Sequence, residues 1–377
     1  MTVSTVRYRV ISLLIAVILL STMFSHVVGD DSQQDPLLED DGIEQKVLII
    51  GIDGVRGDVA EIVAQRNDSA FGRIKDEGAW SFNTSIGPYA ISGPGWSSML
   101  TGVWCDRHGV VDNSFYGSKL SSVPDLFEHL ESNDPNLRTA AVYWWEPIGE
   151  DILSADSIDV MERFENDGLV RDRAVELLNT DPELDVLFVS IDNPDAVGHD
   201  YGFSPDVPEY VAAVEAADDM ARDVIDALEQ RDLSGEDWII IITSDHGGGD
   251  RFLKSHHASE PIDQRTFMLV TGGATVAGEM TNDPVVVDVV VTALTHLEVP
   301  LPEGDLALDG RASAFDPDAA SAREPVCREP LLFYQVDLMI WIGVGVLSVA
   351  VASFLILKKK RRSNLEHKVA PELPVAE

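Results

Sequence analysis

The stretch KVLIIGID at residues 46–53 places an aspartate directly after a continuous apolar run. A short run without polar alternation is typical of a strand that is buried on both faces of a parallel sheet. Similar runs occupy residues 139–144, 185–191, 238–243 and 267–271, and helical periodicity occupies residues 123–130, 170–178, 207–228 and 285–297. Strands that alternate with helices predict an α/β domain whose central sheet is mostly parallel and flanked by helices.

Acidic and imidazole side chains follow three of these runs. Asp53 follows the first, Asp195 and His199 follow the run that ends at residue 191, and Asp245 and His246 follow the run that ends at residue 243. An aspartate after a strand can be a helix cap, and a histidine in a glycine-rich turn can be structural. Ligands of open α/β sheets bind beyond the carboxyl ends of the strands, however, and carboxylates with imidazoles are what zinc ions require. These residues, with His257 further on, therefore predict a metal site at one edge of the sheet.

A candidate nucleophile lies in AISGPGWSSMLTG at residues 90–102. Pro94 is suited to the first position of a helix that runs toward Leu100. Ser92 would then lie at a helix N-terminus, where free N–H groups and the helix dipole favour an anion. The alternative is that Ser92 only caps this helix.

The charge of the chain excludes one class of function. Against 65 acidic residues stand 27 lysines and arginines, which gives a formal net charge of −38. Nucleic-acid binding depends on neutralising phosphates with basic side chains, so we expect no nucleic-acid partner. Cys105 and Cys327 are the two cysteines. They could form a disulfide outside the cytoplasm, but their spacing does not assign one.

Two apolar segments predict export and membrane attachment. Residues 1–29 resemble a secretory signal peptide, with an uncleaved signal anchor as the alternative. Residues 338–357 carry no charge, match the bilayer core in length and precede five basic residues, which by the positive-inside rule belong in the cytoplasm. We therefore expect a cell-membrane protein, crossing once or twice, with an extracellular catalytic domain. The predicted segments are an acidic linker (30–44), the catalytic domain (45–312), a juxtamembrane stalk (313–330), the transmembrane helix (338–357) and a cytoplasmic tail (358–377).

Five motifs together resemble a known family. In order they are GIDG (51–54), SGPGWSSMLTG (92–102), RHGVVDN (107–113), PDAVGH (194–199) and SDHGG (244–248). This order resembles the alkaline phosphatase superfamily, and within it the type I phosphodiesterase/nucleotide pyrophosphatase branch. The resemblance covers roughly residues 46–312 and implies an alkaline phosphatase-like fold.

The resemblance also implies two divalent metal ions, with zinc as the expected metal. One set of ligands would be Asp195, His199 and His257, with His256 as the alternative to His257. The other set would be Asp53, Asp245 and His246, completed by the hydroxyl of Ser92. Manganese or calcium could replace zinc at oxygen and imidazole ligands.

The implied reaction is a double displacement through a phosphoserine intermediate. Ser92 would attack phosphorus, and two metal ions together can stabilise the entering and the leaving oxygens. Asn113 and the amide of Gly93 at the helix start would contact the remaining phosphate oxygens. The substrate would be a small-molecule or lipid-derived phosphodiester, and the membrane would be contacted through the C-terminal helix.

Two departures from the family pattern and one from the sulfatase signature bear on substrate. Gly95 stands where asparagine is common, and Cys105 replaces a common proline. Trp96 occupies the position of the arginine in the sulfatase signature, which disfavours a sulfatase. Two other functions stay open: a phosphomonoesterase, which usually needs a cationic group near the motifs, and a non-catalytic receptor ectodomain on the same scaffold.

Overall fold

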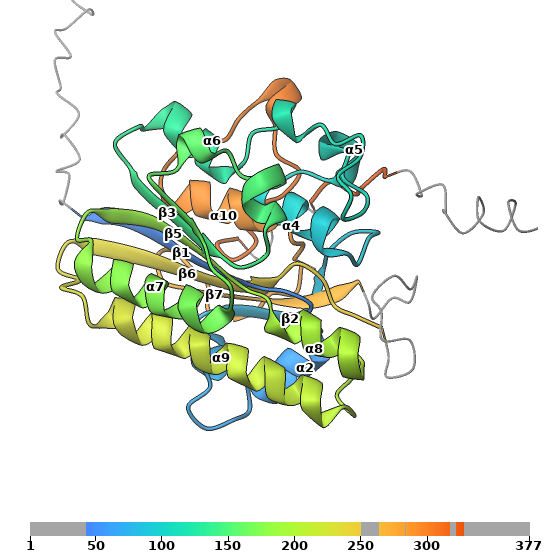
Figure 1. Ribbon diagram of the computed structural model, residues 1–377. Helices are drawn as coiled ribbons and strands as arrows, with labels where there is room; N and C mark the ends of the chain where they lie inside the picture. The colour runs from blue at the N-terminus through green and yellow to red at the C-terminus, as the bar shows by residue number, and fades with distance from the viewer. Residues whose placement is uncertain (1–42, 250–263, 283, 317–321, 328–377) are drawn as a thin grey trace, which may run out of the picture.

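One mixed sheet forms the centre of the protein in the computed structural model, which describes residues 43–249, 264–282, 284–316 and 322–327 (Figure 1). The predicted N-terminal signal, the transmembrane helix at 338–357 and the tail at 358–377 lie outside these residues, as do His256 and His257. Among the described helices, none has the length and apolar character needed to cross a bilayer.

The sheet contains eight strands in the order β4-β3-β5-β1-β6-β7-β2-β8. The mostly parallel sheet predicted from the sequence is confirmed, except that β7 runs antiparallel to both β6 and β2. β1 begins at Glu44, inside the segment expected as a linker. The strands are β1 (Glu44–Ile52), β2 (Ala79–Ser85), β3 (Arg138–Tyr143), β4 (Val160–Arg163), β5 (Leu184–Ile191), β6 (Glu236–Ser244), β7 (Arg265–Thr271) and β8 (Gly278–Glu279).

Helices cover both faces of the sheet (Figure 1). The face with α7 and α9 also carries α2, α3 and α8, and the other face carries α4, α6 and α10. The helices are α2 (Gly57–Val63), α3 (Ala70–Glu77), α4 (Ser92–Thr101), α5 (Cys105–His108), α6 (Leu126–Asn133), α7 (Asp167–Thr180), α8 (Asn193–Tyr201), α9 (Pro208–Glu229) and α10 (Asp288–His296). Shorter helical turns are η1 (Leu120–Ser122), η2 (Ile148–Ile152), η3 (Ala155–Ser157) and η4 (Gly304–Leu306).

The continuous apolar run of β1 serves two cores, because successive side chains of a strand point to opposite faces. Val47 and Ile49 belong to the core under α4 and α10, whereas Leu48 and Ile50 belong to the core under α7 and α9. All four side chains are fully buried. A strand that is covered on both faces has no need of polar alternation, which explains why the run reads as uniformly apolar.

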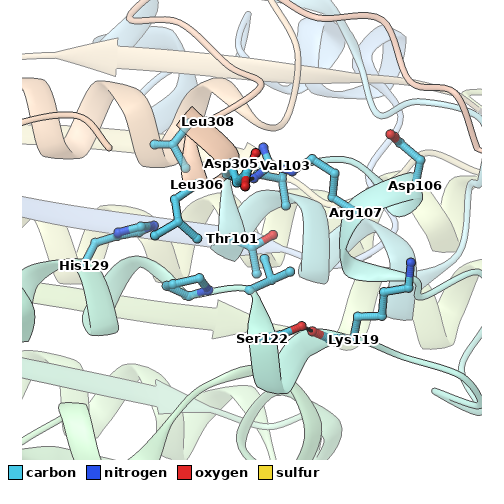
Figure 2. A pocket seen from close by; sticks show the side chains of 12 residues that line it. Thr101, Val103, Asp106, Arg107, Lys119, Ser122, His129, Asp305, Leu306 and Leu308 are labelled. Carbon is cyan, nitrogen blue, oxygen red and sulfur yellow. Dashed lines mark hydrogen bonds between the residues drawn. The ribbon is translucent and has the colours of Figure 1, made fainter. Parts of the chain in front are cut away.

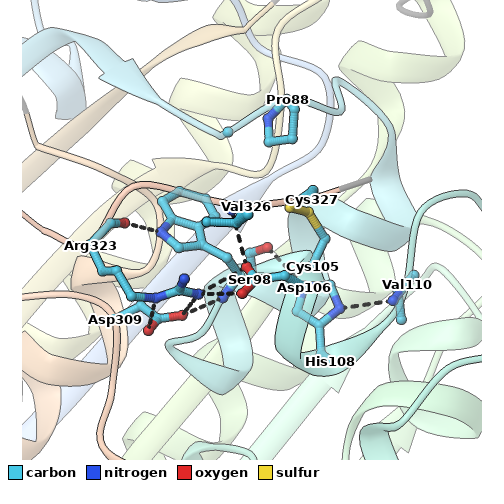
Figure 3. The surroundings of a disulfide bond; sticks show 12 residues. Pro88, Ser98, Cys105, Asp106, His108, Val110, Asp309, Arg323, Val326 and Cys327 are labelled. Carbon is cyan, nitrogen blue, oxygen red and sulfur yellow. Dashed lines mark hydrogen bonds and ion pairs between the residues drawn. A yellow bond between two sulfur atoms is a disulfide. The ribbon is translucent and has the colours of Figure 1, made fainter. Parts of the chain in front are cut away.

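The last described segment is bonded to the region that follows α4 (Figure 3). Cys105 at the start of α5 forms a disulfide with Cys327, across 222 residues of sequence. Arg323 forms ion pairs with Asp106 and Asp309, at 2.9 and 2.6 Å. Part of the segment expected as a stalk therefore packs against the domain, and the pairing of the cysteines that the sequence left open is formed.

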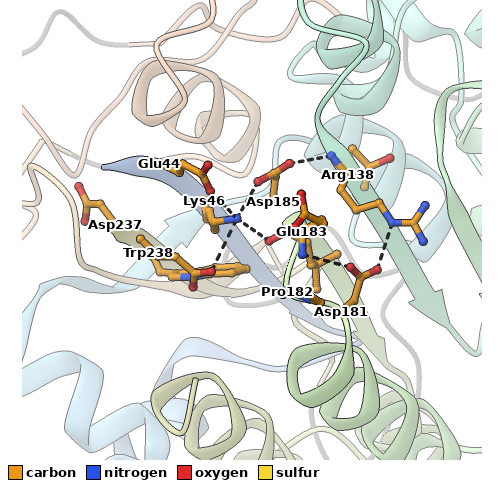
Figure 4. A network of polar contacts seen from close by, with 12 residues as sticks. Glu44, Lys46, Arg138, Asp181, Pro182, Glu183, Asp185, Asp237 and Trp238 are labelled. Atoms are coloured by element: carbon orange, nitrogen blue, oxygen red, sulfur yellow. Dashed lines mark hydrogen bonds and ion pairs between the residues drawn. The ribbon is translucent and has the colours of Figure 1, made fainter. Parts of the chain in front are cut away.

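A buried lysine joins the strands at the edge of the sheet opposite to the strand ends that carry Asp53 and Asp245 (Figure 4). The ammonium group of Lys46 lies 2.8 Å from Asp185 Oδ1 and donates to the Leu184 carbonyl at 3.2 Å. Burial alone would lower the pKa of Lys46, but the bonded Asp185 and the nearby glutamates outweigh it and raise the pKa. Lys46 therefore remains charged in the fold and links β1 to β5.

Replacing Lys46 should destabilise the domain without changing the local structure at the other end of β1, where Asp53 lies. Lys46→Met leaves a buried carbonyl and a partly buried carboxylate without their cation, so we expect the free energy of unfolding to fall by about 2–4 kcal/mol. Denaturant unfolding of the full chain measures this. The control is Lys119→Met, because Lys119 is exposed and forms no ion pair with the described residues. Equal stability of the two variants would contradict the role given to Lys46.

Candidate active site

The carboxyl ends of three neighbouring strands bring the predicted metal ligands together. β5, β1 and β6 lie side by side in the sheet, and Asp195, Asp53 and His246 follow their ends. One ligand atom from each of these three residues lies within 4.8 Å of the other two, which is close enough for metal coordination at this edge. The sequence prediction that polar residues after separate strands converge on one edge of the sheet agrees with this placement.

The second predicted ligand set is centred on the imidazole of His246. Its Nε2 lies 3.2 Å from Asp53 Oδ1 and 3.4 Å from Asp245 Oδ2. Both carboxylate oxygens are buried and accept no hydrogen bond from the described residues. Their partner oxygens are engaged, because Asp53 Oδ2 accepts from Trp96 Nε1 and Asp245 Oδ1 accepts from the Gly54 N–H.

The orientation of His246 also suits a metal ligand. Its Nδ1 lies 2.6 Å from the Gly247 carbonyl, so Nδ1 carries the proton and donates it there. With Nδ1 committed as the donor, Nε2 faces Asp53 and Asp245, and a metal ion that displaced the proton from Nε2 would meet its lone pair there. Two buried oxygens without donors and one imidazole nitrogen form a donor set of the kind that holds Zn²⁺, so the residues present fit the implied metal.

The electrostatics of the cluster point the same way. Burial and the charge of Asp53 raise the pKa of Asp195 to about 7 and the pKa of Asp245 well above its usual value. Burial would lower the pKa of His246, but Asp245, Asp53 and Asp195 outweigh it and raise the pKa to about 10. Three carboxylates are thus held together at a cost that a divalent cation would offset.

Ser92 meets this cluster at the start of α4. Its Oγ lies 3.2 Å from His246 Nε2, and the side chain is buried. α4 begins at Ser92, two residues before the proline predicted to open it. Gly95 allows the helix to approach the end of β6, because a Cβ at this position would lie 2.4 Å from the Asp245 carbonyl oxygen.

The amide of Gly93 has a different partner from the one expected. Its N–H donates to Asn113 Oδ1 at 2.7 Å instead of being free for a phosphate oxygen. This bond fixes the side-chain amide of Asn113 with its oxygen toward the helix, which leaves Nδ2 as the donor. Asn113 is exposed, so this donor is accessible to a substrate.

His199 is the outermost of the predicted ligands in the described structure. Its side chain is 42% exposed, and Nε2 lies 3.4 Å from Asp195 Oδ2. The ring packs edge-on against Phe203, with 5.4 Å between the ring centres. The third member of this predicted set, His257, lies outside the described residues.

His108, at the end of α5, has a structural role. His108 accepts from the Val110 N–H and lies 3.0 Å from Ser98 Oγ, and burial lowers its pKa to about 3. A cavity of about 260 Å³ lies at the opposite end of α4 from Ser92 and is lined by Thr101, Arg107, Lys119 and His129 among others (Figure 2). None of the predicted site residues lines this cavity.

The family comparison agrees with the site. A family model described as type I phosphodiesterase/nucleotide pyrophosphatase matches residues 47–299. The chain belongs to this family. Bis(5'-adenosyl)-triphosphatase ENPP4 from Homo sapiens and from Pongo abelii are each 26% identical to it over 263 residues. The match covers 62% of this chain and 52% of either relative, so the chain spans about half the length of these curated proteins.

Solved structures share the fold. Murine ENPP5, an ectonucleotide pyrophosphatase/phosphodiesterase, superposes with a TM-score of 0.53 at 15% identity, over 69% of this chain and 97% of that one. A 2-O GAG sulfatase gives a TM-score of 0.51 at 15% identity, over 70% of this chain and 72% of that one. At such identities the likeness concerns the fold alone, and it supports the expected alkaline phosphatase-like architecture.

The close contact at Gly95 generates a prediction. Alanine favours a helix interior by about 1 kcal/mol over glycine, yet Gly95→Ala should push α4 away from Asp245 and separate Ser92 from His246. We expect a lower melting temperature together with a loss of turnover. The control is Gly168→Ala in α7, where the added Cβ would meet only the side-chain oxygen of Asn166, at 3.2 Å. A Gly95→Ala variant as stable and active as the wild type would contradict the close approach.

Proposed function

We propose that this chain is a metal-dependent hydrolase of phosphoric diesters with Ser92 as its nucleophile. The observation that carries the proposal is the position of Ser92 Oγ, 3.2 Å from the imidazole nitrogen on which Asp53 and Asp245 also converge. A serine hydroxyl needs activation to attack phosphorus at neutral pH, and a cluster of metal-ligating side chains around it provides the place for that activation.

The two ligand sets have separate tasks in this proposal. Asp53, Asp245 and His246 would hold the ion beside Ser92, and Asp195, His199 and His257 would hold the second ion. Bound zinc would lower the pKa of the serine hydroxyl and compensate the negative charge of the phosphate. Asp195 lies within 4.8 Å of atoms from Asp53 and His246, which supports two adjoining sites.

The chain's own residues define the course of the reaction. A bond forms from Ser92 Oγ to phosphorus as the bond to the leaving alcohol breaks; the serine loses its proton, and the leaving alkoxide gains one. Water then cleaves the phosphoserine bond and restores Ser92. The Nδ2 group of Asn113, turned outward by the bond from Gly93, would donate to a phosphate oxygen throughout.

Diesters are favoured over monoesters because the described residues around the site supply little cationic charge from arginine or lysine. Arg56, three residues after Asp53, donates to Asp58 and to the Phe203 carbonyl, so its charge is already compensated. The bis(5'-adenosyl)-triphosphatase activity for which the ENPP4 relatives are named supports a nucleotide as the organic part of the substrate.

We place the catalytic domain outside the cell, attached to the cell membrane through residues 338–357. The Cys105–Cys327 disulfide supports this location, because disulfides persist in oxidising compartments. The positive-inside pattern of residues 358–362 supports the orientation.

Removing the nucleophile tests the mechanism. Ser92→Ala should lower kcat toward an aryl phosphodiester on the order of 10³-fold or more, and metal content measured by elemental analysis should remain. The matched control is Ser97→Ala on the same helix, because the buried Ser97 hydroxyl has no hydrogen-bond partner among the described residues. Turnover by Ser92→Ala at the wild-type rate would exclude the assignment.

The substrate class needs a separate measurement. We expect kcat/KM for bis(p-nitrophenyl) phosphate to exceed that for p-nitrophenyl phosphate by about tenfold or more, because a monoester brings an extra charge for which the described residues around the site offer no free arginine or lysine. A ratio below one would favour the phosphomonoesterase. Absence of turnover on both substrates by the zinc-loaded chain would favour the receptor.

A further inference from the structure

We propose that Trp96 is a positioning residue that holds Asp53 as a one-oxygen metal ligand and couples the nucleophile helix to the metal site. This inference rests on the proposed function. The geometry behind it is a hydrogen bond from Trp96 Nε1 to Asp53 Oδ2 at 2.9 Å. Asp53 Oδ1, the other oxygen, lies 3.2 Å from His246 Nε2 and belongs to the group of potential metal ligands.

The hydrogen bond from Trp96 gives the two carboxylate oxygens of Asp53 different roles. With Oδ2 held by the indole, Oδ1 is the oxygen that is turned toward His246 and toward a metal ion there. Without the indole the carboxylate can rotate about its terminal torsion, which is broad for aspartate. Other geometries then compete with coordination through Oδ1 alone. In one of them both oxygens of Asp53 bind one ion, and in another the carboxylate moves closer to His246.

Trp96 and Ser92 are placed by the same helix. They are four residues apart on α4, so they lie on one face, one turn from each other. Any shift of α4 that displaces Ser92 from His246 therefore also alters the hydrogen bond to Asp53. Nucleophile and metal ligand are thus aligned by one rigid element.

The sheet is shaped to receive the indole. A Cβ at Gly51, two residues before Asp53, would lie 2.5 Å from the Trp96 ring, so only glycine leaves space for it. Phe188 on β5 packs edge-on against the same ring, with 5.9 Å between the ring centres. Trp96 is fully buried, so water cannot replace its N–H at Asp53.

A second buried tryptophan provides the comparison. Trp104 is also almost fully buried, and its Nε1 donates to a backbone carbonyl, that of Arg323, away from the ligand cluster. Losing the N–H of Trp104 removes a similar bond from the same side of the sheet. A metal-specific effect should therefore appear at Trp96 and be absent at Trp104.

The experiment measures metal binding directly. Purified full-length chain is stripped with a chelator and titrated with Zn²⁺ against a chromophoric competitor. We expect two sites in the wild type, and Trp96→Phe should weaken one of them about 10–100-fold, as loss of a partner behind a ligand typically does. In turnover, kcat should fall with little change in KM, and excess Zn²⁺ should restore part of it.

The controls separate the possible results. Trp104→Phe should bind zinc as the wild type does, and Gly51→Ala, which displaces the indole but keeps its N–H, should reproduce the Trp96→Phe defect. Gly51→Ala also provides the test if Trp96→Phe fails to fold. Wild-type affinity at both sites in Trp96→Phe, or an equal loss in Trp104→Phe, would overturn the positioning role. A wild-type chain that binds no zinc would instead overturn the proposed function.

Discussion

The main physical constraint on this structure is the mutual repulsion of three carboxylates that the sheet brings close together. The parallel strands β5, β1 and β6 end at the same edge, so the chain cannot place Asp195, Asp53 and Asp245 apart once the strands pair. In the described part of the site the imidazole of His246 faces all three carboxylates, and that of His199 lies beside Asp195. A divalent cation would remove this repulsion, and in the proposed function the same ion would activate Ser92.

Close packing turns that cluster into a reaction centre. α4 can lie against the ends of the strands because Gly95 faces the Asp245 carbonyl and Gly51 faces the Trp96 ring without side chains. The disulfide at the start of α5 and the ion pairs of Arg323 tie the segment at residues 322–327 to the region just after α4. At the other end of the sheet, the ion pairs of Lys46 connect the N-terminal ends of β1, β5 and β6 to one another. The described part of the site is therefore built on strand ends and on α4, as a positioned nucleophile requires.

The sequence was sufficient to predict what depends on local pattern. Uninterrupted apolar runs located β1, β5 and β6, and the polar residues after them located the candidate ligands. Strand direction depends on pairing across the sheet, so the antiparallel β7 was not predictable from its apolar run. The partners of Gly93 and Trp96 were missed because both bonds join residues at least 20 positions apart. The sequence held one signal for the hydrogen bond between Trp96 and Asp53. Trp96 lies four residues after Ser92, which places both on the helical face that meets the ligand cluster. The predicted roles of His256, His257 and the membrane segments concern residues outside the described structure and stay predictions.

Anomalous diffraction at the zinc edge, from crystals grown with Zn²⁺ and without chelator, tests the central claim most directly. The account predicts one peak bonded to Asp53, Asp245 and His246 within reach of Ser92 Oγ, and a second peak bonded to Asp195 and His199. Well-ordered crystals with no peak at this edge of the sheet, or with the metal bound away from Ser92, would contradict it.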